Sequence, residues 1–123
     1  TADDAPERCK RLLDEMSLLA KSTNNKDLTP DVVTYNTVID SYARRGRAQE
    51  ADKTLREMLL KAKVVPTVVS FNSVMNAWSK SDAEDGPERC KVLLATMDVL
   101  ASSKNINGLA PNTITYNTVI DAY

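Results

Sequence analysis

An internal repeat constrains the fold of this chain more than any other feature. Residues 5–42 (APERCKRLLDEMSLLAKSTNNKDLTPDVVTYNTVIDSY) align with residues 86–123 (GPERCKVLLATMDVLASSKNINGLAPNTITYNTVIDAY) at 22 of 38 positions without a gap. A looser copy of the TYNTVID box, SFNSVMN at residues 70–76, divides the separation of 81 residues into steps of 36 and 45. Periods of this length are typical of solenoids, in which stacked helical units bury a continuous core.

Each unit is predicted to contain two amphipathic helices. A first helix is expected over residues 32–46, ending at Gly46, and a second helix over residues 47–61. The segment KVVPT at residues 63–67 interrupts the pattern, which restarts at Val68. The predicted apolar faces of the first helices are Tyr35, Val38, Ile39 and Tyr42 in one unit, and Phe71, Val74, Met75 and Trp78 in the next. We therefore expect an all-α fold, an α-solenoid of helix-turn-helix repeats.

The second helices of two other units are predicted to begin near residues 5 and 86. Asp4 and Asp85 each precede a proline and stand three residues before a glutamate, which is typical of a helix N-cap. The predicted buried side of the earlier helix is Leu12, Leu13, Met16 and Leu19, and that of the later helix is Leu93, Leu94, Met97 and Leu100.

The opposite side of each first helix also follows a pattern. At about 100° per residue, Val33, Asn36, Asp40 and Arg44 fall in one sector of the first helix. Val69, Asn72, Asn76 and Lys80 occupy the same sector of the next one, and Ile114, Asn117 and Asp121 that of the last. We call this set the ordered face. It places an aliphatic residue and an amide at the same points of every unit, although asparagine is a poor helix former.

Composition excludes several kinds of chemistry. The chain has no histidine, and this removes Ser-His and Cys-His nucleophile pairs and histidine metal ligands. Its three glycines are scattered singly, so no glycine-rich phosphate loop is present. We therefore predict no catalytic residue, no cofactor and no metal site, hence a protein that is not an enzyme. Apolar runs of four or five residues fall far short of the ~20 needed for a membrane span.

The two cysteines and the net charge bear on disulfide formation and on nucleic-acid binding. Cys9 and Cys90 occupy equivalent positions two units apart, which predicts two free thiols rather than a disulfide. The net charge of −1 argues against a non-specific nucleic-acid binder, which would be basic. This net charge is compatible with a nucleic-acid binder whose cations lie together on one face.

The repeated asparagines have two possible roles. They can form hydrogen bonds with the backbone or with the adjacent unit, in which case their role is structural. Alternatively, the ordered face contacts a ligand that repeats as the units do. Single-stranded RNA is such a ligand, because helical repeats can recognise one base per unit with two or three side chains.

A family resemblance favours the second role. The segment PDVVTYNTVIDSYARRGRAQEADKTLREML, residues 30–59, closely resembles the pentatricopeptide repeat, a helix-turn-helix unit of organellar RNA-binding proteins. The resemblance covers nearly the whole chain. It implies a partial repeat at 1–31, a repeat at 32–67, a lengthened repeat at 68–112 and a partial repeat at 113–123.

The resemblance also implies which residues contact RNA. In that family the fifth and the last residue of a unit together select the base, and asparagine at the fifth position accompanies pyrimidines. The base-recognition residues implied here are Asn36 with Thr67, Asn72 with Asn112, Asp31 of the leading partial unit and Asn117 of the trailing one. The implied base-sandwiching residues are Val33, Val69 and Ile114. The candidate phosphate contacts are Arg44, Arg45 and Lys80.

The function implied is sequence-selective binding of single-stranded RNA, one base per repeat, with a pyrimidine preference. By the same resemblance the protein would act in a mitochondrion or plastid, in RNA stabilisation, processing or translation. The alternative is a protein-interaction scaffold, such as a subunit of a large organellar complex, in which the asparagines take no part in RNA recognition.

Overall fold

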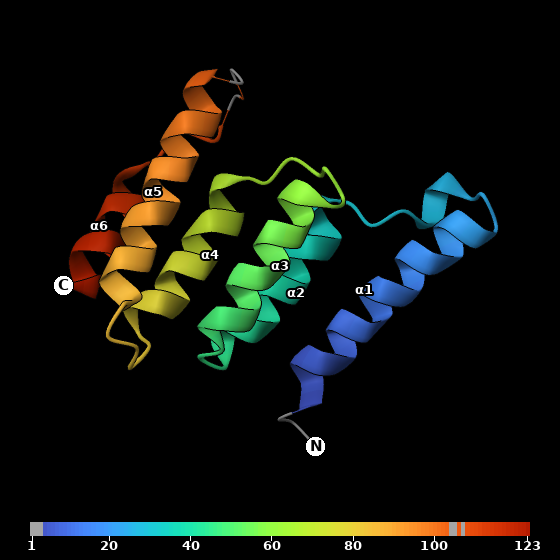
Figure 1. Ribbon diagram of the computed structural model, residues 1–123, viewed down its shortest axis with the longest axis horizontal. Helices are drawn as coiled ribbons and strands as arrows, with labels where there is room; N and C mark the ends of the chain where they lie inside the picture. Colours follow the sequence, from blue (N-terminus) through green and yellow to red (C-terminus); the bar gives the residue numbers. More distant parts are fainter. Residues whose placement is uncertain (1–3, 104–105, 107) are drawn as a thin grey trace.

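The computed structural model describes residues 4–103, 106 and 108–123 and shows an all-helical chain (Figure 1). No strand occurs within these residues, so the predicted all-α fold is confirmed. The elements are α1 (Ala5–Ser22), a short 3₁₀ turn η2 (Lys26–Leu28), α2 (Val32–Arg44), α3 (Ala48–Leu60), α4 (Val68–Ser79), α5 (Gly86–Ser103) and α6 (Thr113–Ala122).

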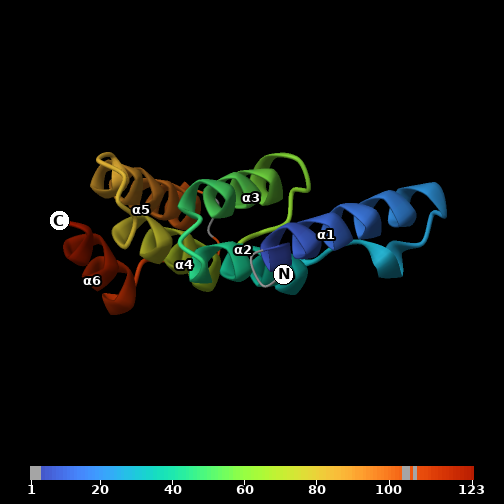
Figure 2. The ribbon, with the colours of Figure 1, turned by 90° about the horizontal axis from the view of Figure 1, so that it is seen from below.

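The helices form two layers that extend along the long axis of the molecule. Helices α2 and α3 form one hairpin, and α4 and α5 form the next (Figure 1). The first helices α2, α4 and α6 pack side by side in one layer, and α3 and α5 lie over them in the other (Figure 2). This stacking of hairpins is the solenoid that the repeat predicts.

A capping box starts every first helix. Asp31, Thr67 and Asn112 are the N-caps of α2, α4 and α6, and the side chain of each accepts the backbone N–H of the residue three positions later. The hydroxyls of those later residues accept the N-cap N–H in return; they are Thr34, Ser70 and Thr115. Two backbone donors are thus satisfied at each helix start, and the three first helices begin at equivalent residues.

The core follows the predicted apolar faces of α2 and α4. Ile39, Phe71, Val74 and Met75 are fully buried, and Tyr35, Val38, Tyr42 and Trp78 nearly so. From α3, Ala48, Ala51, Leu55 and Met58 pack against them. Gly46, with φ of +70°, occupies the left-handed region in the turn that joins α2 to α3, a conformation that glycine adopts without a side-chain clash.

The prediction for α1 was partly wrong. Leu13 is buried as expected, but Leu12 and Leu19 are 61% and 49% exposed. Among the described elements α1 packs against α2 and η2, and these contacts leave Leu12 and Leu19 exposed. In α5, which packs on both α4 and α6, Leu93 and Met97 are buried.

The predicted capping by Asp4 is also wrong. Asp4 is the N-cap of α1, but its side chain makes no capping hydrogen bond. Its backbone has helical angles, φ −86° and ψ −6°, rather than the extended angles of Asp31, Thr67 and Asn112. Only the extended geometry directs an N-cap side chain at the free amides of the first turn.

A buried polar contact joins the two hairpins. The indole Nε1 of Trp78 in α4 donates to Oδ2 of Asp52 in α3 at 2.9 Å, and Asp52 is 4% exposed. The other carboxylate oxygen accepts from Arg56 Nε at 3.0 Å. The guanidinium of Arg89 in α5 lies over the Trp78 ring with its Cζ 5.4 Å from the ring centroid, within the ~6 Å of a cation–π contact.

Both cysteines are free thiols. Cys9 is half-buried, whereas Cys90 is fully buried and its Sγ donates to the Met75 carbonyl at 3.3 Å. Burial raises the pKa of the Cys90 thiol to about 11, so this group stays protonated at neutral pH.

Candidate nucleic-acid interface

An aliphatic residue is exposed at the second position of every first helix. Val33 of α2, Val69 of α4 and Ile114 of α6 are 67%, 61% and 64% exposed. These residues occupy equivalent positions of α2, α4 and α6, three helices that lie in one layer (Figure 2). Exposed apolar groups at equivalent positions of successive units are suited to packing against the faces of bases.

The fifth-position amide of the first full unit contacts the start of the next unit. The Ser70 hydroxyl donates to Asn36 Oδ1 at 2.5 Å, and Asn36 Nδ2 donates to Thr67 Oγ1 at 3.4 Å. Thr67 and Ser70 are the two members of the capping box of α4. Asn36 therefore links α2 to the first turn of α4.

The same arrangement recurs one unit later. Thr115 Oγ1 donates to Asn72 Oδ1 at 2.8 Å and lies 2.9 Å from Asn112 Oδ1. The Thr115 oxygen in turn accepts the backbone N–H of Asn112 at 3.1 Å. Asn72 Nδ2 has no hydrogen-bond partner among the described residues.

These contacts correspond to the structural role considered for the asparagines, but they do not enclose the side chains. Asn36 and Asn72 remain partly exposed; the oxygen of each amide accepts a hydroxyl of the next first helix, and one N–H of Asn36 also donates to Thr67. The amide nitrogens thus supply the N–H groups left for a ligand. Asn117 is exposed and has no hydrogen-bond partner within the described chain.

Sequence reasoning missed the part played by Ser70 and Thr115. Both are fully buried polar residues, which calls for a hydrogen-bond partner. A signal was present in the sequence, because each stands three residues after a good N-cap, Thr67 or Asn112. Their contact with the preceding amide, however, spans 34 and 43 residues.

The fifth and last residues of the two predicted full units lie close together, through two different contacts. Asn36 and Thr67 bond directly, whereas Asn72 and Asn112 meet through the Thr115 hydroxyl. Asp31 caps α2, and no fifth-position amide contacts it within the described residues. Hydrogen bonds from the Thr34 backbone N–H and hydroxyl lower the pKa of Asp31.

The candidate phosphate contacts lie at the other end of the first helices. Arg44 Nε pairs with Asp40 Oδ2 at 2.7 Å, and an Arg45 guanidinium N–H donates to the Ser41 carbonyl at 3.4 Å. Lys80 is exposed at the C-cap of α4. Arg44 follows Asn36 by eight residues, about 12 Å along a helix. The structure therefore separates these cations from the amides, and their role in RNA binding stays a prediction.

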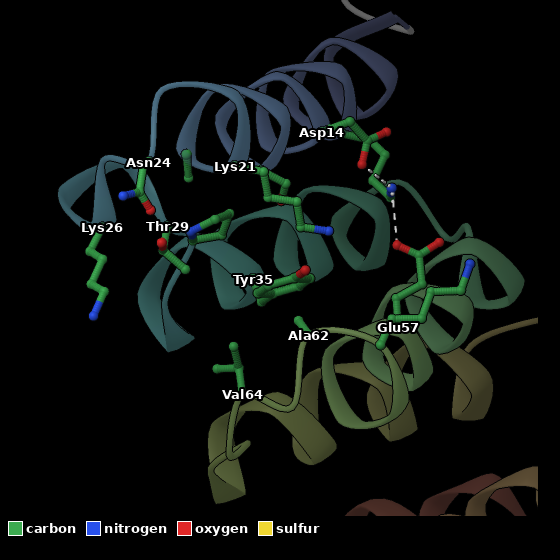
Figure 3. Close-up of a pocket in the computed structure, with 14 residues that line it drawn as sticks. Asp14, Lys21, Asn24, Lys26, Thr29, Tyr35, Glu57, Ala62 and Val64 are labelled. Atoms are coloured by element: carbon green, nitrogen blue, oxygen red, sulfur yellow. Dashed lines mark hydrogen bonds and ion pairs between the residues drawn. The ribbon is translucent and has the colours of Figure 1, made fainter.

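A groove lies elsewhere on the molecule. It has a volume of about 640 Å³ and runs between α1 and α3 with Tyr35 on its inner side (Figure 3). Lys10 spans it, bonding Asp14 at 2.7 Å and Glu57 at 3.1 Å. Burial works against the charged form of Lys10, but these carboxylates outweigh it and raise its pKa. None of the predicted RNA-contacting residues lines this groove.

In the described residues, no group of three or more cysteine, aspartate or glutamate side chains is placed to hold a metal ion. Within the same residues, no helix combines the length and the apolar character needed to cross a membrane.

Comparison with known proteins accounts for the repeat. Residues 30–80, which span α2, α3 and α4, match the PPR repeat family. These residues belong to the pentatricopeptide repeat family. The resemblance found in the sequence is thereby confirmed, and the all-helical structure is consistent with the solenoid of helical repeats that this resemblance implies.

Its relatives include several plant proteins. A mitochondrial pentatricopeptide repeat-containing protein of Arabidopsis thaliana is 27% identical over 98% of this chain and 33% of its own length. A chloroplastic one from the same plant is 28% identical over 96% of this chain and 20% of its own length. An Arabidopsis small ribosomal subunit protein is 26% identical over 85% of this chain and 23% of its own length. The chain thus spans a third or less of these relatives.

Proposed function

We propose that this pentatricopeptide repeat chain binds single-stranded RNA on the ordered face, one nucleotide per repeat, without catalysing a reaction. One observation carries the proposal. Asn36 and Asn72 each present amide N–H groups from a fixed side chain, with an exposed aliphatic residue three positions earlier in the same helix. Such a pairing offers a base both an edge contact and a face contact in every unit.

We expect the amides to act as donors toward pyrimidines. Each amide oxygen already accepts a hydroxyl of the next unit, whereas N–H groups of Nδ2 remain for a base. Cytosine and uracil share the O2 carbonyl, an acceptor for such a donor, whereas adenine offers only ring nitrogens as acceptors. Single-stranded bases are recognised by such edge hydrogen bonds combined with stacking. Val33, Val69 and Ile114 would then lie between successive bases.

The units of recognition would be residues 32–67 and 68–112, with partial units at 1–31 and 113–123. Each full unit ends at the N-cap of the next first helix, Thr67 or Asn112. Unit one combines an asparagine with a threonine hydroxyl, and unit two combines two amides. The donors offered to RNA would therefore differ between the units, which is the basis for sequence selectivity.

Relatives named mitochondrial and chloroplastic favour action inside an organelle. There the chain would contribute to the stabilisation, processing or translation of a transcript. Stacked bases supply about 1–3 kcal/mol each, so a few units alone bind weakly. The relatives are several times longer than this chain, and a longer array would bind more tightly.

A second candidate function is docking within a protein complex. One relative is a small ribosomal subunit protein. In α6, Tyr116, Ile120 and Tyr123 are 48–70% exposed, although the equivalent side chains of α2 and α4 are buried. This apolar surface would suit a helical partner, and no base contact would be needed.

The two functions are separated by titrating fluorescein-labelled uridine and adenosine hexamers into the chain at 20 and 200 mM salt. RNA recognition predicts tighter binding of the uridine hexamer, a loss of affinity at higher salt, and no preference in an Asn72→Ala, Asn117→Ala double variant. An Asn24→Ala, Asn25→Ala double variant, altered in the loop before η2, is the matched control and should bind as the unaltered chain does. Equal, weak binding of both hexamers by all three proteins would contradict RNA recognition and favour docking.

A further inference from the structure

The hydroxyls of Ser70 and Thr115 each lie between two successive units and contact both. Ser70 lies in the first turn of α4 and donates to the amide oxygen of Asn36 in α2. Thr115 lies in the first turn of α6 and donates to that of Asn72 in α4. Both side chains are fully buried, so neither hydroxyl can contact RNA itself. Any effect on a base must act through the asparagine that the hydroxyl holds.

We infer that base selection by each repeat is set in part by the third residue of the following repeat. Ser70 would orient the amide of Asn36, and Thr115 that of Asn72. This inference rests on the proposed function, and it assigns Ser70 and Thr115 as positioning residues rather than RNA contacts.

The hydrogen bonds of the two hydroxyls indicate which atom of each asparagine amide faces the ligand. Thr115 Oγ1 accepts the Asn112 backbone N–H, and its single hydrogen faces two amide oxygens, Asn72 Oδ1 at 2.8 Å and Asn112 Oδ1 at 2.9 Å. Ser70 Oγ likewise accepts the Thr67 backbone N–H and donates to Asn36. An amide that rotated its NH₂ group toward either hydroxyl would exchange this bond for one to the second lone pair of the hydroxyl oxygen. In the orientation found, the hydroxyl contacts Oδ1, which leaves Nδ2 of Asn72 and one N–H of Asn36 for the ligand.

Without the hydroxyl, the two orientations of the amide become similar in energy. The base would then meet an acceptor as often as a donor, and the distinction between a uridine O2 and an adenosine edge would weaken. A change in a residue that RNA does not touch would thus alter which base the preceding unit prefers.

A matched control for Thr115 is present at the start of α2. Thr34 forms the same capping box with Asp31 at the start of α2, but no fifth-position amide contacts its hydroxyl within the described residues. Thr34→Val and Thr115→Val both remove a capping-box hydroxyl. Only Thr115→Val also removes the bond to an asparagine of another unit. Thr115→Ser keeps the hydroxyl and serves as the conservative rescue.

The experiment measures affinity for a series of uridine hexamers in which one position at a time is adenosine. For the unaltered chain, affinity should fall at each position that a unit recognises. In Thr115→Val the response at one position should flatten by about tenfold, the ratio that corresponds to one hydrogen bond. Thr115→Ser and Thr34→Val should keep the full pattern, and Ser70→Ala should flatten a neighbouring position.

Three results would overturn the inference. In the first, Thr115→Val keeps the full positional pattern. In the second, Thr34→Val loses the pattern as much as Thr115→Val, so that the loss comes from the capping box. In the third, the Nδ2 proton signals of Asn72 in ¹⁵N-labelled free chain are the same in Thr115→Val as in the unaltered chain, which would mean that the hydroxyl does not orient the amide. If the unaltered chain binds no hexamer at all, the proposed function fails with the inference, and the free-chain signals show whether the orientation itself exists.

Discussion

Thr115 Oγ1 and Asn72 Oδ1 lie 2.8 Å apart although 43 residues separate them in the chain. The pair joins the first turn of α6 to the middle of α4, and Ser70 and Asn36 repeat the contact between α4 and α2. The solenoid is therefore fastened by a polar bond in each unit as well as by its apolar core. The same bond leaves an amide nitrogen beside an exposed aliphatic side chain.

The base-sandwich residues are tested by shortening one of them. Val69→Ala should weaken binding of the uridine hexamer by about 1 kcal/mol, the value of the apolar area removed. The melting temperature should hardly change, because Val69 is 61% exposed. Val92→Ala in α5, where Val92 is 60% exposed, is the matched control. Equal binding by the two variants would exclude Val69 from the RNA contact.

The contact between the hairpins predicts a loss of stability in Asp52→Ala. This change leaves the buried Trp78 Nε1–H without an acceptor, which costs about 1–3 kcal/mol of unfolding free energy. Asp52→Asn keeps an acceptor oxygen and should cost less. Urea unfolding followed by tryptophan fluorescence measures both. A variant Asp52→Ala as stable as Asp52→Asn would show that the indole bond contributes nothing.

The lowered pKa of Asp31 predicts how the chain responds to acid. Hydrogen bonds from Thr34 favour the ionised carboxylate in the folded state, so the folded pKa lies below the reference value of 3.8. The resulting stability is present above pH 3.8 and is lost as the pH falls through the lowered folded pKa. Asp31→Asn should still cap α2, but its melting temperature should fall less between pH 5 and pH 2.5. An unchanged slope would contradict this linkage.

The cysteines should differ in reactivity. Cys9 is half-buried, whereas Cys90 is fully buried with a pKa of about 11. Because the thiolate is the reactive form, iodoacetamide at pH 8 should label Cys9 of the folded chain and leave Cys90 unmodified. Mass spectrometry of peptides would quantify both sites, with urea-unfolded chain as the control. Equal labelling of the two cysteines in the folded chain would contradict the burial of Cys90.

The sequence was sufficient to predict the helices and most of the core, because burial imposes a period on each first helix. Tyr35, Ile39, Phe71 and Met75 all follow that period and all are buried. Leu12 follows it as well, yet it is exposed, because the period cannot tell whether a second neighbour packs against α1.

The candidate site was predictable only in part. The amides fall at one point of each repeat, and a helical projection places them on one face. The bonds that hold Asn36 and Asn72 depend on where the next helix begins and how closely it packs, and a projection of one helix contains neither. The donor character of these amides therefore emerges only from the assembled units.

The central claim is that the amides of Asn36, Asn72 and Asn117 contact RNA bases. Titration of uridine hexamer into ¹⁵N-labelled chain, with the side-chain NH₂ signals of all asparagines recorded, tests it most directly. The claim predicts that the signals of these three residues shift together and saturate at one concentration, while those of Asn24 and Asn25 beside η2 stay in place. Binding that shifts none of the three, or that shifts Asn24 and Asn25 equally, would contradict it.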